Sequence, residues 1–162
     1  MVVVDSSALV PLAWVGRLNL VTDVLEDIQT VDGVRAEVLV EGKRGVATLE
    51  TLLDGVSMHP RPSNAERVAE LEGLSVTDAA VILLADAEND VLLANDKALI
   101  DVAESHGIEG WWVTTLLLKC AKDGVLSGDE ATDVLYELVD EGTNLNPKVY
   151  ARLQRELHEN GE

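Results

Sequence analysis

Short apolar runs alternate with longer amphipathic stretches along this chain of 162 residues. Runs this short, separated by helical stretches, are typical of the strands of a buried parallel sheet. A further run, Leu74–Asp78, has the same apolar character, although Thr77 could also cap a helix there. The segments expected to be strands are Met1–Asp5, Thr30–Arg35, Gly55–His59, Val91–Ala94 and Ile108–Val113.

Apolar positions at helical spacing predict the helices between and after these runs. Ser6-Ser7 and Ser63 are expected caps, Pro11 is expected in the first turn of its helix, and Gly42 and Gly45 are expected bends. The predicted helices are Ala8–Val15, Leu18–Ile28, Glu37–Leu53, Ala65–Glu72, Ala79–Glu88, Lys97–His106, Thr115–Lys122, Asp129–Glu141 and Pro147–His158.

This alternation of strand and helix predicts an α/β protein with a three-layer α/β/α fold and a mostly parallel, roughly five-stranded sheet. No linker or repeat divides the chain, so we expect a single domain over residues 1–162. Its core is expected over about residues 1–113, with a helical extension over about 114–158.

Acidic residues recur where the short apolar runs end. Asp5, Asp78 and Asp96 each follow such a run, and a fourth acid, Glu41 or Glu37, lies in the helix expected after the second strand. Any one of them could be a helix cap or a dipole-compensating residue. Ligands of parallel sheets, however, bind outside the carboxyl ends of the strands. Converging carboxylates there would repel one another without a hard cation, which predicts a Mg²⁺ or Mn²⁺ site.

The composition is strongly acidic, with 30 acids against 12 bases and a formal net charge of −18. Such a surface is either simply very soluble or suited to a cytoplasm with molar salt, where the Debye length falls to about 3 Å. We favour the halophilic interpretation. The single cysteine, Cys120, excludes an internal disulfide and a thiolate zinc site, and its apolar context predicts a core position.

No apolar run approaches the roughly 18 residues that would span a bilayer, and the first residues carry no basic region typical of a secretory signal. We therefore expect a cytoplasmic protein with no membrane partner.

Three segments resemble the motifs of PIN domains, the family of Mg²⁺- or Mn²⁺-dependent ribonucleases that includes the VapC-like toxins. VVVDSSALVPLA resembles the opening of the family, and SVTDAAVILLADAENDVLLANDKAL resembles its second block. WWVTTLLLKCAKDGVLS resembles the closing segment of an archaeal-type subgroup, with leucine near Leu117 where a glycine is often found. Together with the charge, this resemblance suggests a halophile.

The resemblance implies which acids would bind the metal and catalyse. Asp5, Asp78 and Asp96 match directly, while VRAEVLVEGKRG aligns best with Glu41 as the fourth acid and leaves Glu37, one helical turn earlier, as the alternative. It also implies cleavage to a 5′-phosphate and a 3′-hydroxyl, by one ion or two. Asp78 or Asp96 could accept the proton of the attacking water.

Other residues could assist. Ser7 could hold the site through its hydroxyl, and Asn95 could orient water or form a turn. The basic residues Lys43, Arg44 and Lys97 could contact phosphate or lie on a solvated face. The tryptophans Trp14, Trp111 and Trp112 could stack on bases or pack against the protein.

We therefore expect a metal-dependent endoribonuclease that acts on single-stranded RNA and is either the toxin of a toxin–antitoxin pair or an RNA-processing relative. Expected partners are RNA, an antitoxin protein and a second copy in a homodimer. The alternative is an inactive PIN-type nucleic-acid-binding or scaffold protein. A phosphatase or flavodoxin-like phosphate binder ranks last, because DSSAL supplies no glycine-rich loop after the first strand.

Overall fold

The computed structural model describes residues 1–40, 42–143, 145 and 147–160. Its sheet is entirely parallel, in the order β3-β2-β1-β4-β5. The central strand is β1, in which Val3 pairs with Gln29 on one side and Leu92 on the other. The strands are β1 (Val2–Val4), β2 (Ile28–Val31), β3 (Ser57–His59), β4 (Val91–Leu93) and β5 (Gly110–Trp111).

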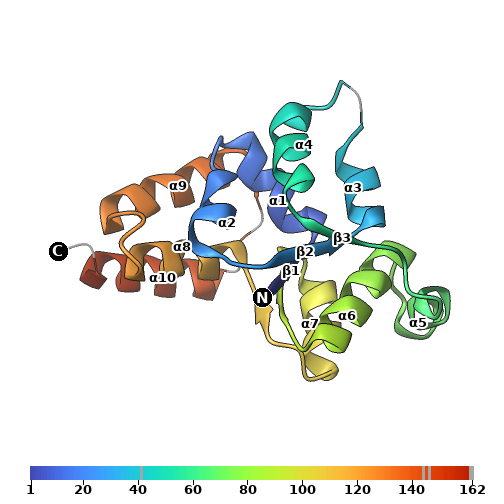
Figure 1. Ribbon diagram of the computed structural model, residues 1–162. Helices are drawn as coiled ribbons and strands as arrows, with labels where there is room; N and C mark the ends of the chain where they lie inside the picture. Colours follow the sequence, from blue (N-terminus) through green and yellow to red (C-terminus); the bar gives the residue numbers. More distant parts are fainter. Residues whose placement is uncertain (41, 144, 146, 161–162) are drawn as a thin grey trace.

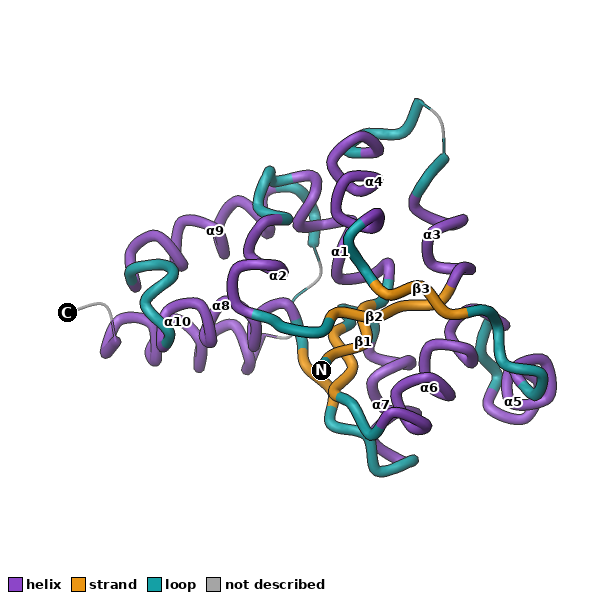
Figure 2. The backbone as a smooth tube through the Cα atoms, in the orientation of Figure 1, coloured by secondary structure: helices purple, strands orange, loops and turns teal. Residues whose placement is uncertain are grey.

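Helices cover both faces of this sheet, as Figures 1 and 2 show. One face carries α1 (Ser6–Trp14), α3 (Asp32–Val38) and α4 (Val46–Asp54). The other carries α5 (Ala65–Glu72), α6 (Val76–Glu88) and α7 (Lys97–Ser105). The predicted three-layer α/β/α fold is confirmed. The remaining helices gather beside the sheet: α2 (Asn19–Val24), α8 (Val113–Lys122), α9 (Gly128–Asp140) and α10 (Pro147–Asn160).

The centre of the core is formed by the strand β1 and the helix α6. All three valines of β1 are buried, and α6 packs across β1, β2 and β4. The side of α6 toward the sheet begins with Ala79 and Ala80, whose small side chains let the helix lie close to the strands. Apolar surface removed from water here is the main source of stability.

The second helix and second strand differ from the sequence prediction. A helix over Leu18–Ile28 is wrong, because α2 ends at Val24 and Ile28 already begins β2. Between them Asp27 adopts a left-handed conformation with φ of 51°, which a continuous helix does not allow.

The predictions of a strand over Thr30–Arg35 and of one helix over Glu37–Leu53 are also wrong. The strand β2 stops at Val31, and α3 follows at once from Asp32. Gly45 has φ of +83° immediately before α4, so it starts a new helix instead of bending an old one. Glu41 falls between the two helices and lies outside the described residues.

Several caps also differ. The helix α1 begins at Ser6 and is capped by Asp5, so Pro11 lies in its second turn and not in the first. Leu74–Asp78 is not a strand, since Ser75, in place of Thr77, caps α6. At α5 the cap position is Asn64 in place of Ser63.

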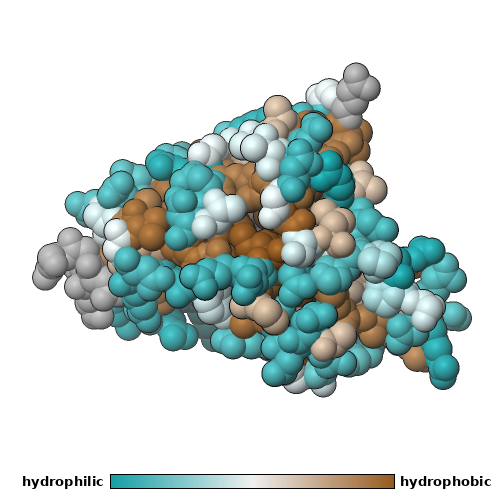
Figure 3. Space-filling view, in the orientation of Figure 1, coloured by the Kyte–Doolittle hydropathy of each residue, from teal (hydrophilic) through white to brown (hydrophobic). Residues whose placement is uncertain are grey.

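Cys120 is buried in α8 as expected, and its burial raises the pKa of the thiol to about 11. None of the helices in the described part of the chain is long and apolar enough to cross a membrane. Figure 3 shows hydrophilic residues over most of one face, with hydrophobic residues exposed in a hollow near its centre.

Candidate functional site

Asp5 lies at the end of the central strand with its side chain in the interior. The residue is 2 % exposed, and its amide N–H donates to the carbonyl of Leu93 at 3.0 Å, which ties the end of β1 to the end of β4. Its Oδ2 accepts hydrogen bonds from the amide (3.1 Å) and the hydroxyl (2.6 Å) of Ser7. Its Oδ1 is buried and has no hydrogen-bond partner among the residues that the structure describes.

A buried carboxylate with one oxygen unsatisfied is unfavourable unless another group compensates it. Burial is the main reason that the pKa of Asp5 is raised, and the charge of Glu37 raises it further. Asp5 is therefore a site where a cation would be stabilised.

The hydroxyl of Ser7 joins Asp5 to the next strand. While it donates to Asp5, it accepts a 2.8 Å hydrogen bond from the backbone N–H of Asn95. The turn after β4, which leads directly to Asp96, is thereby held against the start of α1.

Asp78 lies in the first turn of α6, where its amide donates to the Ser75 hydroxyl at 3.1 Å. Its pKa is raised to about 6, first by partial burial and then by neighbouring negative charges. Those charges belong to Asp5, Asp96 and Glu37. Four carboxylates from four segments of the chain thus act on one another at the carboxyl edge of the sheet.

Two of these carboxylates each accept a hydrogen bond from the protein. Asp96 caps α7 by accepting from the amide of Leu99 at 3.2 Å. Glu37, on α3, accepts from the hydroxyl of Ser6 at 2.9 Å. Both interactions use one oxygen of the carboxylate and leave the other available.

The helices that carry Glu37 and Asp78 meet at their first turns. A Cβ atom added to Gly33 would lie 2.7 Å from Oγ1 of Thr77 and 3.1 Å from its Cγ2. Only glycine allows α3 and α6 to approach this closely. Gly33 was not singled out from the sequence and Ser6 was expected only as a helix cap, because their roles here depend on contacts between distant segments.

The carboxylates nevertheless do not surround a single point. Within the described ranges, no three acidic, histidine or cysteine side chains are close enough to hold one metal ion together. Glu41, the favoured fourth acid in the sequence, cannot be placed relative to them because it lies outside those ranges.

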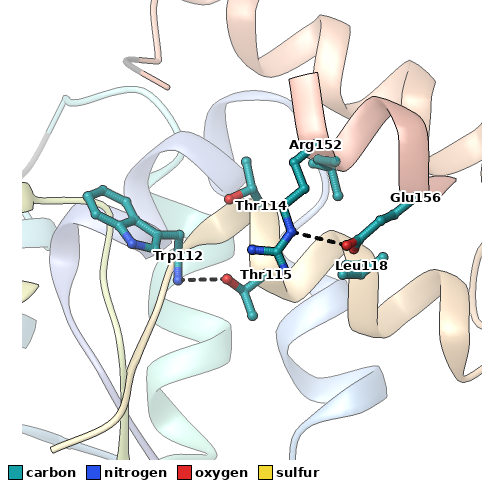
Figure 4. A pocket seen from close by; sticks show the side chains of 7 residues that line it. Trp112, Thr114, Thr115, Leu118, Arg152 and Glu156 are labelled. Carbon is teal, nitrogen blue, oxygen red and sulfur yellow. Dashed lines mark hydrogen bonds and ion pairs between the residues drawn. The ribbon is translucent and has the colours of Figure 1, made fainter. Parts of the chain in front are cut away.

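A separate cavity of about 230 Å³ lies between α8 and α10 (Figure 4). Trp112, Leu118 and Arg152 line it together with Glu156, which pairs with Arg152 at 3.1 Å. None of the four carboxylates at the sheet edge lines this cavity. It therefore differs in chemistry and place from the acidic site.

Two of the three basic residues that could contact phosphate, Arg44 and Lys97, form other contacts. Arg44 lies 5.4 Å over the ring of Trp14 and pairs with Glu141 at 2.8 Å, while Lys97 pairs with Asp101 in its own helix. Arg61, which sequence reasoning missed, lies just after β3 and lines a cavity with Thr77. An isolated arginine between two prolines gave no recognisable signal.

A family model described as a PIN domain (DUF3368) matches residues 1–159. The chain belongs to the PIN-domain family. PIN domains are generally nucleases and typically use divalent metal ions. Comparison with curated proteins and with solved structures finds no match. The PIN-domain resemblance is therefore confirmed, whereas the VapC-like subgroup and the halophilic origin stay predictions.

Proposed function

We propose that this PIN-domain protein is a metal-dependent endoribonuclease whose site is formed by Asp5, Glu37, Asp78 and Asp96. The observation that carries the proposal is the raised pKa of Asp78, which results first from its partial burial and then from the negative charges of the other three acids. Carboxylates at the ends of neighbouring parallel strands repel one another, and a divalent cation removes that repulsion.

Glu37 is proposed as the fourth acid in preference to Glu41. Its charge raises the pKa of both Asp5 and Asp78, and its bond to Ser6 fixes its position beside the start of α1. Glu37 lies four positions before Glu41, the residue favoured by alignment.

The available donors fit Mg²⁺ or Mn²⁺. These ions prefer hard oxygen ligands and bind through few carboxylates together with water and substrate phosphate. Asp5 offers the unsatisfied buried Oδ1, and Glu37, Asp78 and Asp96 offer further carboxylate oxygens. When bound, the ion supplies Lewis-acid stabilisation of the scissile phosphodiester and a more acidic water.

The protein's own residues have distinct parts in this proposal. Ser7 fixes the orientation of Asp5, and Ser6 fixes that of Glu37. Either Asp78 or Asp96 takes the proton of the attacking water, since each is a carboxylate at the same edge of the sheet as the buried Asp5.

Cleavage of a labelled single-stranded RNA with Mn²⁺ tests the proposal. Asp5→Asn and Asp78→Asn should each lower the rate by at least about 100-fold, because they remove charge that holds the cation. Asp133→Asn, an exposed acid on α9, serves as the matched control and should cleave like the parent. Parental cleavage rates in the two site variants would reject the proposed ribonuclease function.

One observation keeps a second function open: the described residues present no three-membered metal group. A PIN domain that binds RNA without cutting it would suit that arrangement. Such a protein would bind RNA in EDTA and in Mn²⁺ alike, and Asp78→Asn would leave its affinity unchanged or higher.

We further propose that the nuclease is the toxin of a toxin–antitoxin pair and acts as a homodimer in the cytoplasm. The support is that the motifs of this chain resemble those of the family that includes the VapC-like toxins. Growth arrest on expression, relieved by the product of the adjacent gene, tests the first part, and sedimentation of the purified protein tests the second.

A further inference from the structure

A cavity of about 380 Å³ lies between the first turns of α3 and α6 and the segment that follows β3, and is lined by Thr77, the residue before Asp78. In Figure 1 these three parts lie together at one edge of the sheet. Its apolar wall includes Val31 and Val76, and its polar groups are Asp32, Arg61 and Thr77. The volume is within the range of small-molecule sites, which start near 300 Å³.

Arg61 is available to a ligand. Its contact with Glu66 is 3.6 Å long, and the two side chains are 54 % and 74 % exposed. Exposed ion pairs of this kind contribute little, so a ligand can replace Glu66 easily. Arg44, in contrast, is held by both an aromatic ring and a carboxylate.

The charges of the cavity favour a nucleobase over a phosphate. Asp32 lines the cavity, and the carboxylate cluster begins at Asp78, next to Thr77. A phosphate group would bring a further negative charge beside these acids. A base is neutral, its faces suit an apolar wall, and unstacked bases of single-stranded RNA are read by their edges.

The pairing of one arginine with one carboxylate selects among the bases. Arginine donates well to O6 and N7 of guanine, and a carboxylate accepts from the N–H groups on the opposite edge of the same base. Adenine presents an amino donor where guanine presents O6, so it would oppose Arg61. Resting on the nuclease function proposed above, we infer that this cavity binds a guanine base of the RNA next to the scissile phosphate.

Direct binding tests the inference without cleavage. Guanosine is titrated into the full chain in EDTA, and amide chemical shifts are followed by NMR. We expect shifts at Gly33 and Thr77, an affinity at least about tenfold higher for guanosine than for adenosine, and a similar loss of guanosine affinity in Arg61→Gln and Asp32→Asn. Inosine, which lacks the amino group of guanine, should be intermediate.

Arg67→Gln is the matched control, because Arg67 is an exposed residue on α5 that does not line the cavity. It changes the net charge as Arg61→Gln does and should bind guanosine like the parent. Equal affinity for guanosine and adenosine, absence of shifts, or an equal loss in Arg67→Gln would overturn the inference.

Sequencing the ends of fragments from a random single-stranded RNA pool separates this inference from the function it rests on. The parent should show guanine at one fixed position beside the cut, and Arg61→Gln should lower that preference about tenfold while cleavage continues. Mn²⁺-dependent cleavage without a guanine preference would reject the cavity assignment alone. Cleavage unchanged in Asp78→Asn would instead reject the nuclease site, and the guanosine titration would still decide what the cavity binds.

Discussion

The hydroxyl of Ser6 donates a 2.9 Å hydrogen bond to Oε2 of Glu37, a residue 31 positions further along the chain. This contact joins the start of α1 to α3 and holds the Glu37 carboxylate on the side of Asp5, whose pKa it raises. The pair supports Glu37 as the fourth acid of the proposed site.

Exchanging each glutamate tests that assignment. We expect Glu37→Gln to lower Mn²⁺-dependent RNA cleavage by at least about tenfold, since loss of a metal-site carboxylate or of its orienting partner typically has that effect. Glu41→Gln should retain the parental rate in the same assay. A larger loss of cleavage in Glu41→Gln than in Glu37→Gln would instead favour Glu41 as the fourth acid.

Adding one methyl group at Gly33 should destabilise the fold. The new Cβ would lie 2.7 Å from Oγ1 of Thr77, so α3 and α6 would have to move apart, at a cost of about 1–3 kcal/mol. Urea unfolding of Gly33→Ala measures the loss. Combining it with Thr77→Ala removes the clashing atoms and should recover part of the stability, while purely additive effects would show that the contact is not the cause.

Stability without metal should fall as the pH rises through the acidic range. The pKa of Asp78 is about 6 in the folded protein against 3.8 as its ordinary value, so the folded state binds the proton more tightly. The stabilisation is complete below 3.8 and is lost as the pH rises through about 6. Thermal unfolding in EDTA from pH 4 to 7 should show this slope, and Asp78→Asn should make it shallower. An unchanged slope in the variant would place the titrating group elsewhere.

Divalent ions should reverse that loss at neutral pH. A cation that binds only the folded state stabilises it by about 2.7 kcal/mol at a concentration 100 times its dissociation constant. Melting curves at pH 7 should therefore rise with added Mn²⁺ in the parent and much less in Asp5→Asn. An equal rise in both proteins would indicate binding outside the acidic site.

Salt should stabilise the whole protein. A net charge of −18 on 162 residues makes the folded surface repel itself, and added salt shortens the range of that repulsion. Melting temperatures measured from low to multimolar KCl should increase steadily. A flat or falling trend would argue against the halophilic interpretation of the composition.

The strands β1 and β4 could be predicted because they are uninterrupted apolar runs. The valines of β1 and the leucines of β4 are buried on both faces, so their pattern is unambiguous and places Asp5 and Asp96 at their ends. The start of β2 was missed because it contains Gln29, a polar residue in a buried position. Its side chain donates to Asp90 at 2.8 Å and contacts His59 at 2.7 Å, partners that become visible only in three dimensions.

The contacts around the proposed site were harder to predict than the fold. Its aspartates follow from local patterns, but the break between α3 and α4 depends on the left-handed conformation of Gly45, which sequence spacing alone did not reveal. Because that break was missed, Glu37 and Glu41 seemed to share one helix face. Arg61 escaped notice for a related reason, since only the packing of α3 on α6 creates the cavity that it lines.

The bond between the Asp5 amide and the Leu93 carbonyl also limits when a growing chain can form the acidic cluster. The first acid leaves the ribosome early, yet the strand beside it and the turn that leads to Asp96 are synthesised some ninety residues later. A nascent or prematurely terminated polypeptide that lacks β4 therefore cannot assemble the cluster. The proposed attack on RNA would therefore wait until synthesis has passed Asp96 of the 162 residues.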